Sequence, residues 1–260
     1  TELRWVDATM TRFRADSEIG RANLAAGREA VPVSAGTALV LERALAWADG
    51  SNGAFDPCLG RAAAAWEVTE RRVPPSADAL RPLARAGLWK ALDVSTWRGR
   101  PAVKLHDAHA ALDLGGIAKG FGVDLAVAAL RDHGVEHALV NVGGDLFALG
   151  TSEDGDAWRV GIRSPDEPTQ LVGRIALRDE AVATSGDYAR RFEHGGRTYH
   201  HLLDPTTAAP RETAVHSVSV TAGSCLEADA AATAAFGLEG RGAAALLARV
   251  APDARIVSHA

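Results

Sequence analysis

The most suggestive stretch of the sequence is Asp113-Leu-Gly-Gly-Ile-Ala-Lys-Gly120, in which a predicted strand leads into a glycine pair and a helix begins. Apolar residues at helical spacing continue from Ile117 to His133, and Gly134 predicts the helix end. Glycines let a backbone approach a ligand closely, and a helix N-terminus binds anions. Lys119 adds a positive charge in the first turn. A tight turn with a solvated lysine explains the same residues, so both interpretations stay open.

The region before this stretch is predicted to be mainly helical. Ser34 is a candidate N-cap for a helix that stops near Gly50, and Ser76 for a helix that runs to Gly87. The two helices are separated by residues 71–75, where consecutive prolines predict a surface connection.

Short strands dominate the remainder of the chain. Ser224 and Glu227 form the pattern of a capping box that opens an alanine-rich helix through Phe236, and a last helix is expected over residues 242–250. Hairpin strands with segregated helices predict an α+β fold rather than a parallel doubly wound one. The expected strands are residues 102–105, 110–114, 137–142, 158–163, 171–177, 213–221 and 255–259, with a hairpin over 191–199.

Composition excludes several classes of protein. With 260 residues, of which 47% are hydrophobic and 23% charged, the chain resembles an ordinary globular protein rather than a disordered or coiled-coil one. Its net charge is −5 and basic residues are not clustered, which argues against nucleic acid as a partner. The sequence contains no run of 18 apolar residues, so no transmembrane segment is predicted. Cys58 and Cys225 lack the spacing of a metal site and are expected to be buried thiols.

A second group of residues suggests a metal site. Asp229 and Thr233 are four residues apart on the alanine-rich helix and therefore share one face. A carboxylate and a hydroxyl are hard oxygen ligands that suit Mg²⁺. Helix-dipole and backbone interactions of the same two residues are the alternative.

Histidines and glycines provide weaker candidates. Adjacent strand residues point to opposite faces, so His200 and His201 are not expected to bind one metal, and one of them is better suited to be a base. Residues 141–145 form either a ligand-approach loop or a turn. The GxSxG pattern is absent, which argues against serine-hydrolase chemistry.

Taken together and in order, these segments resemble the ApbE family, the FAD:protein FMN transferases. The resemblance covers nearly the whole chain and implies one domain over residues 1–260, with room for two subdomains. It also implies mixed, largely antiparallel sheets with segregated helices, in an ApbE-like (T-fold-like) architecture. The matching segments are residues 13–19, 53–57, 113–121, 140–145, 183–188, 201–207 and 228–236.

The resemblance implies a role for each site residue. Mg²⁺ would be held by the Gly116 carbonyl, Asp229 and Thr233. FAD is the implied substrate, with Lys119 close to its pyrophosphate and His201 as the candidate base. The other implied FAD contacts are Phe13, Ala54, Phe55, Asp56, Asp113 and Leu203.

The implied reaction is Mg²⁺-dependent transfer of FMN from FAD to a threonine hydroxyl of a partner flavoprotein, which releases AMP. Two other functions fit the same residues: a Mg²⁺-dependent FAD pyrophosphatase that uses water, and a non-catalytic FAD-binding protein. The compartment is expected to be cytoplasmic if the chain is complete, and exported or membrane-anchored if a signal has been removed.

Three features depart from the family pattern. Thr207 is followed by Ala208 where the family has glycine, which predicts strain if this position has a positive φ. Phe13 replaces a more usual tyrosine and keeps only the stacking face. The family's N-terminal segment, with its flavin-side methionine, is short or absent from the given sequence.

Overall fold

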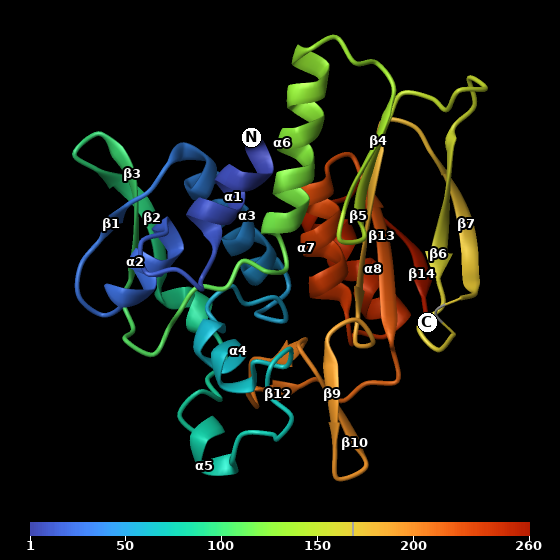
Figure 1. The fold of residues 1–260 in the computed structure, drawn as a ribbon. Helices are drawn as coiled ribbons and strands as arrows, with labels where there is room; N and C mark the ends of the chain where they lie inside the picture. The colour runs from blue at the N-terminus through green and yellow to red at the C-terminus, as the bar shows by residue number, and fades with distance from the viewer. Residues whose placement is uncertain (168) are drawn as a thin grey trace. The chain divides into compact units, whose positions relative to one another are not determined.

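The computed structural model describes residues 1–167 and 169–260, which form two compact units (Figure 1). The first unit contains residues 1–4, 116–188 and 213–260, and the second contains residues 5–115 and 189–212. Segment 189–212 of the second unit therefore interrupts the first unit in sequence.

The first unit is built on a five-stranded antiparallel sheet with the order β14-β13-β8-β5-β4. Strands β5 and β13 are buried along their whole length. Strand β4 forms one edge of the sheet. The strands are β4 (Ala138–Val142), β5 (Asp145–Leu149), β8 (Glu180–Gly186), β13 (Ser217–Ala222) and β14 (Arg255–His259).

Helices α6 (Ala118–Asp132), α7 (Cys225–Ala235) and α8 (Gly240–Val250) complete this unit. Helix α7 packs against β8, β13 and α6, and its small alanine side chains allow this close packing. Helix α6 approaches α7 closely at Gly120, where an added Cβ would lie 2.2 Å from the Cys225 carbonyl oxygen. The expectation that α7 begins with a capping serine is confirmed, since the Ser224 hydroxyl accepts a hydrogen bond from the Glu227 amide.

The Asp124 carboxylate ties the start of α7 to α6. It accepts hydrogen bonds from the Cys225 and Leu226 amides at 2.7 and 2.9 Å, which satisfies two of the donors that a helix N-terminus leaves unpaired. Burial raises the pKa of Asp124 to about 6, although both amides act in the opposite direction. The two helices are therefore fixed to each other about one and a half turns from Lys119 and about one turn from Asp229.

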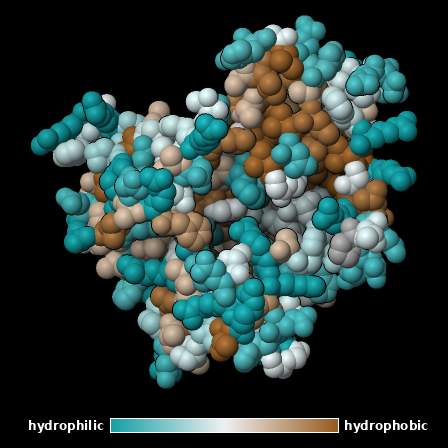
Figure 2. Space-filling view, viewed as in Figure 1, coloured by the Kyte–Doolittle hydropathy of each residue, from teal (hydrophilic) through white to brown (hydrophobic). Residues whose placement is uncertain are grey.

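A separate hairpin of β6 (Trp158–Arg163) and β7 (Leu171–Leu177) shares a small apolar cluster with the sheet. Figure 2 shows apolar side chains gathered on the face that carries α6 and β4. The exposed large apolar residues of this unit include Leu139, Leu171 and Val172.

The second unit combines helices of one to several turns with three small antiparallel sheets. Strand β1 (Val31–Pro32), β3 (Arg100–Leu105) and β2 (Leu92–Trp97) form a sheet in that order. Two hairpins are made by β9 (Arg191–His194) with β10 (Arg197–His200) and by β11 (Leu203–Asp204) with β12 (Ala209–Pro210). The helices are α1 (Glu2–Met10), which begins in the first unit, α2 (Glu18–Leu24), α3 (Ala35–Gly50), α4 (Gly60–Trp66), α5 (Ala77–Leu80) and the 3-10 helix η1 (Leu88–Ala91).

Aromatic stacking holds one end of the second unit. The Trp66 ring centroid lies 5.4 Å from that of Tyr199, which lies 5.3 Å from that of Phe192. The Trp66 indole donates a 2.7 Å hydrogen bond to the Ala208 carbonyl. Ala208 is buried with a φ of 54°, so the strain that its replacement of glycine predicts is present.

The α+β prediction is confirmed, and two predicted elements are wrong. Residues 110–114 are a connection rather than a strand, in which Ala111 forms an isolated bridge with Leu59 and the Asp113 amide donates a 2.8 Å hydrogen bond to the Pro57 carbonyl. The helix that Ser76 caps ends at Leu80, with Arg81 still helical as its C-cap, because Pro82 has no amide hydrogen to continue the helical hydrogen bonds. The cysteines are buried free thiols as expected. Within the described ranges, no helix has both the length and the apolar character that a membrane span requires.

Candidate active site

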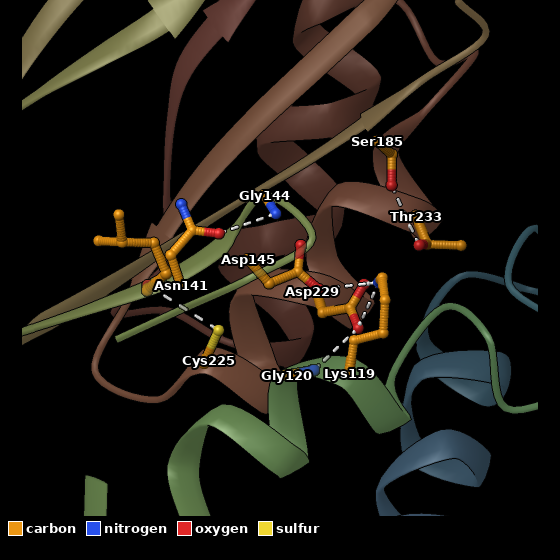
Figure 3. Close-up of polar contacts among 10 residues, drawn as sticks. Lys119, Gly120, Asn141, Gly144, Asp145, Ser185, Cys225, Asp229 and Thr233 are labelled. Carbon is orange, nitrogen blue, oxygen red and sulfur yellow. Dashed lines mark hydrogen bonds and ion pairs between the residues drawn. The ribbon is translucent and has the colours of Figure 1, made fainter. Parts of the chain in front are cut away.

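The first unit brings together three charged side chains that come from distant parts of the sequence (Figure 3). Lys119 Nζ lies 3.0 and 3.1 Å from the two carboxylate oxygens of Asp229, and 2.8 Å from Oδ2 of Asp145. Lys119 is in the first turn of α6, Asp145 begins β5, and Asp229 lies on α7. We call these three residues the charge cluster.

Local sequence explains how Asp145 reaches the charge cluster. Gly143 and Gly144 both have positive φ values, 63° and 103°, in the turn between β4 and β5. The Gly144 amide donates a 3.0 Å hydrogen bond to the Asn141 side chain, which holds this turn. Asp145 therefore enters a fully buried strand directly from a constrained turn, and its position is fixed by the sheet.

Burial differs sharply within the charge cluster. The side chains of Asp145 and Asp229 are 3% and 4% exposed, whereas that of Lys119 is 36% exposed. Burial, the neighbouring carboxylate and its hydrogen bonds shift the pKa of Asp145 upward overall, despite the opposing effect of Lys119. Burial lowers the pKa of Lys119, but the two carboxylates outweigh it and raise the value overall. The ammonium is thus kept charged, and Lys119 has the most exposed side chain of the cluster.

Gly116 and Thr233 lie together beside this cluster. A Cβ built on Gly116 would lie 2.9 Å from both Thr233 Oγ1 and Cγ2, so only glycine brings its backbone this close. Thr233 Oγ1 is also 3.1 Å from Ser185 Oγ on β8. Thr233 follows Asp229 by one turn of α7, as its spacing in the sequence predicted.

The donor types here fit a magnesium ion. Within the described residues, no group of three or more histidine, cysteine or acidic side chains could hold a metal. Mg²⁺ instead suits a few hard oxygen ligands, with water or phosphate completing its coordination. A backbone carbonyl, a carboxylate and a hydroxyl are such ligands, and Gly116 brings its backbone close to the Thr233 side chain.

The second unit contains the other predicted site residues, beginning with Asp113. Its carboxylate lies 2.9 Å from Arg12 Nε and accepts a 2.8 Å hydrogen bond from the Gly115 amide. The Arg12 guanidinium also lies 4.1 Å from the ring centroid of Phe13. Phe13 is 72% exposed, so most of its side chain is accessible to a ligand.

The segment 54–56 is held by the core of the second unit. The Asp56 carboxylate accepts hydrogen bonds from the Cys58 and Trp89 amides at 2.8 and 3.3 Å. Burial raises the pKa of Asp56 to about 6, although these amides oppose it. Phe55 is buried, and the Ala54 carbonyl accepts a hydrogen bond from Arg211. These contacts give the segment a structural role, and its contact with FAD stays a prediction.

The two adjacent histidines differ in burial, as expected for neighbouring residues whose side chains point to opposite faces. His200 is buried, its Nδ1 accepts a hydrogen bond from the Leu202 amide, and its Nε2 lies 3.1 Å from the Arg211 carbonyl oxygen. His201 is half-buried, with Nδ1 3.3 Å from the Arg190 carbonyl oxygen. Leu203 is buried and pairs with Pro210. His200 is therefore structural, and His201 stays the candidate base.

Three residues of these sites were not predicted in their present roles: Asp145, Ser185 and Arg12. Asp145 and Ser185 belong to segments that the family resemblance includes, but nothing local relates either side chain to α7. The signal available for Asp145 was a carboxylate at the start of an apolar strand directly after two glycines. Such a carboxylate is costly to bury unless it has a partner, which Lys119 provides.

Comparisons with known proteins find related sequences and structures. A family model described as the ApbE family matches residues 1–257. The chain is 40% identical over 261 residues to the FAD:protein FMN transferase of Treponema pallidum, covering 95% of this chain and 72% of the relative. It is 33% identical over 236 residues to the FAD:protein FMN transferase of Vibrio cholerae, and the match covers 89% of this chain and 69% of that relative.

Comparison with solved structures also finds ApbE proteins. The structure is similar to the ApbE protein of Thermotoga maritima, with a TM-score of 0.86 and 30% identity over 98% of this chain and 82% of the other. For the flavin transferase ApbE from Vibrio cholerae, the TM-score is 0.83 with 31% identity over 95% and 78% of the two chains.

Proposed function

Because this chain belongs to the ApbE family, we propose that it transfers FMN from FAD to a threonine hydroxyl of a partner flavoprotein. The observation that carries the proposal is the charge cluster beside Thr233, because it combines a lysine for phosphate with oxygen ligands for a cation. The names of the relatives support flavin transfer, and the following steps are our proposal for this chain.

The metal site consists of the Gly116 carbonyl oxygen, the Asp229 carboxylate and the Thr233 hydroxyl. When Mg²⁺ is bound, it supplies positive charge that neutralises the pyrophosphate and the departing AMP. Thr233 can donate its own proton to Ser185 Oγ, 3.1 Å away, which directs a lone pair of Thr233 toward the cation.

Lys119 contacts the pyrophosphate of FAD. Its side chain is 36% exposed and its ammonium has three donors, so it can contact a phosphate while it remains paired with a carboxylate. In the second unit, Phe13 offers its exposed ring to the isoalloxazine, and Asp113 contacts FAD beside Arg12. The proposed adenosine and backbone contacts are those of Ala54, Phe55, Asp56 and Leu203.

His201 is the proposed base for the acceptor threonine. With Nδ1 protonated and facing the Arg190 carbonyl, Nε2 is left as the acceptor. The threonine oxygen forms a bond to the FMN phosphorus, the bond from that phosphorus to the AMP oxygen breaks, and the threonine proton moves to Nε2. The products are a phosphoester-linked FMN on the acceptor and free AMP.

Incubation with FAD and Mg²⁺, with and without a threonine-containing acceptor peptide, tests this proposal. We expect release of AMP together with a peptide mass that increases by one FMN unit. Release of AMP and free FMN without labelling of the peptide would instead support the pyrophosphatase. FAD that stays intact would support a binding protein.

The variant Asp229→Ala should abolish this Mg²⁺-dependent turnover of FAD. Glu227→Gln is the matched control, because Glu227 lies on the same helix but outside the charge cluster, and we expect it to keep its activity. Turnover by Asp229→Ala at the rate of the unmodified protein would remove the proposed metal site.

A further inference from the structure

The carboxylate that is proposed to bind the cation is already paired with an ammonium group. Lys119 Nζ contacts both oxygens of Asp229, and the Gly120 amide donates a 3.1 Å hydrogen bond to Oδ2. Mg²⁺ binds oxygen ligands at about 2.0–2.1 Å, and it carries a charge of the same sign as the ammonium. Binding of the cation therefore requires Lys119 to give up at least part of its contact with Asp229.

Asp145 provides the ammonium with another partner. Its Oδ2 is 2.8 Å from Lys119 Nζ, the shortest of the three contacts. Asp145 belongs to β5 whereas Asp229 belongs to α7, so the cation and the ammonium can occupy carboxylates on different elements. The lysine has a long flexible side chain, and a small rotation is sufficient to move Nζ from both carboxylates to one of them.

We infer that Asp145 is a positioning residue for Lys119, which holds the ammonium when Asp229 takes the cation and keeps it directed toward the phosphate of the substrate. This inference rests on the proposed function, because it assumes a cation at Asp229 and a phosphate near Lys119. It assigns no contact between Asp145 and the cation or FAD.

The charges of the cluster support this role. One lysine and two carboxylates carry a net charge of −1, which attracts a divalent cation into a buried site. Without Asp145, the lysine would have Asp229 as its remaining carboxylate partner in the cluster. Removal of Asp145 is therefore expected to affect cation binding through the position of Lys119 as well as through charge.

A cycle of four proteins separates position from charge: the unmodified chain, Asp145→Asn, Lys119→Met and the double variant. Mg²⁺ affinity is measured by calorimetry without FAD, at a pH of about 8.5, which is above the pKa of about 7 to which burial raises Asp145. We expect Asp145→Asn to weaken Mg²⁺ binding by about tenfold or more when Lys119 is present, the size typical of lost outer-shell partners. In the Lys119→Met background, the same change should cost no more than about threefold.

An equal loss of affinity in both backgrounds would overturn the positioning role, because a simple effect of charge does not depend on Lys119. The unmodified chain distinguishes this failure from failure of the proposed function. If it binds no Mg²⁺, or if Asp229→Asn binds Mg²⁺ as tightly, then the metal site itself is wrong and the inference fails with it. Urea unfolding of each variant verifies that the compared proteins are folded.

A second experiment needs no variant and uses the unmodified protein crystallised with Mn²⁺. We expect Lys119 Nζ to remain within hydrogen-bond distance of Asp145 and to lie beyond the ion-pair limit of about 4 Å from the Asp229 oxygens. A structure with Mn²⁺ at Asp229 in which Lys119 has left Asp145 would overturn the inference.

Discussion

The contact of α6 with α7 at Gly120 gives a prediction whose size follows from the coordinates. In Gly120→Ala, the new methyl group would lie 2.2 Å from the Cys225 carbonyl oxygen and 2.8 Å from Leu226 Cα. These are backbone atoms of a capped helix, so no side-chain rotation relieves the clash. An ordinary separation of at least 3.4 Å requires the two helices to move apart by about 1.2 Å.

Such a movement would also break the 3.1 Å hydrogen bond between the Gly120 amide and Asp229. Overpacking costs about 1–3 kcal/mol, and loss of a hydrogen bond to a charged group costs about 1.5–3 kcal/mol. The higher helix propensity of alanine returns about 1 kcal/mol. We therefore expect the free energy of unfolding to fall by about 3 kcal/mol, and Mg²⁺ affinity to fall with it, because Asp229 and Lys119 lose their alignment.

Urea unfolding followed by circular dichroism measures the first effect, and calorimetry with Mg²⁺ measures the second. Gly242→Ala is the matched control, because Gly242 also lies in a helix of the first unit and its added Cβ would meet nothing closer than 3.9 Å. This control should be neutral or stabilising by up to about 1 kcal/mol. If Gly120→Ala were as stable as Gly242→Ala, the proposed backbone constraint would be refuted.

Three further predictions concern the pyrophosphate contact, the metal ligand and a buried acid. Lys119→Ala should weaken FAD binding more than riboflavin binding, because its target is phosphate; equal losses in fluorescence titrations would contradict this role. Thr233→Val should lower Mg²⁺ affinity by about tenfold or more in calorimetry, whereas Thr233→Ser, which keeps the hydroxyl, should retain it. The raised pKa of Asp56, about 6 against about 3.9 when unfolded, means that the folded state binds its proton more tightly, so stability falls as pH rises from about 4 to 6. Asp56→Asn should therefore show a smaller fall in urea midpoint over this range than the unmodified protein, and an identical fall would argue against the shift.

The sequence was most informative where local chemistry determines structure. Gly134 and Ser224 predicted where α6 ends and where α7 begins, because glycine terminates helices and a serine hydroxyl caps them. Strands β5 and β8 were missed, because buried strands lack the alternation of apolar and polar residues that identifies a half-exposed strand. The short helix α5 shows that one proline can outweigh a good N-cap.

In the candidate site too, the residues that depend on local structure were predicted, and those that depend on long-range contacts were not. Asp229 and Thr233 were predicted to share a face because a helix has a fixed period. The pairing of Lys119 with Asp229 joins residues 110 positions apart, and its geometry depends on the completed sheet and on the contact of α6 with α7. Asp145 was missed for this reason, since its partner cannot be identified from its neighbours in sequence.

The interrupted order of the first unit has a consequence for how the chain folds during synthesis. Residues 116–188 emerge before segment 189–212, and only after that segment do β13, which pairs with β8, and α7, which supplies Asp229, emerge. Long-range contacts of this kind slow folding, because the chain must close a large loop before it gains the interactions that stabilise it. Lys119 and Asp145 therefore lack their third partner, Asp229, until about the last fifth of the polypeptide has been synthesised. A ribosome-bound chain that ends before residue 225 should contain neither a complete core nor a cation site, and the binding of Mg²⁺ would mark the moment at which this unit finishes folding.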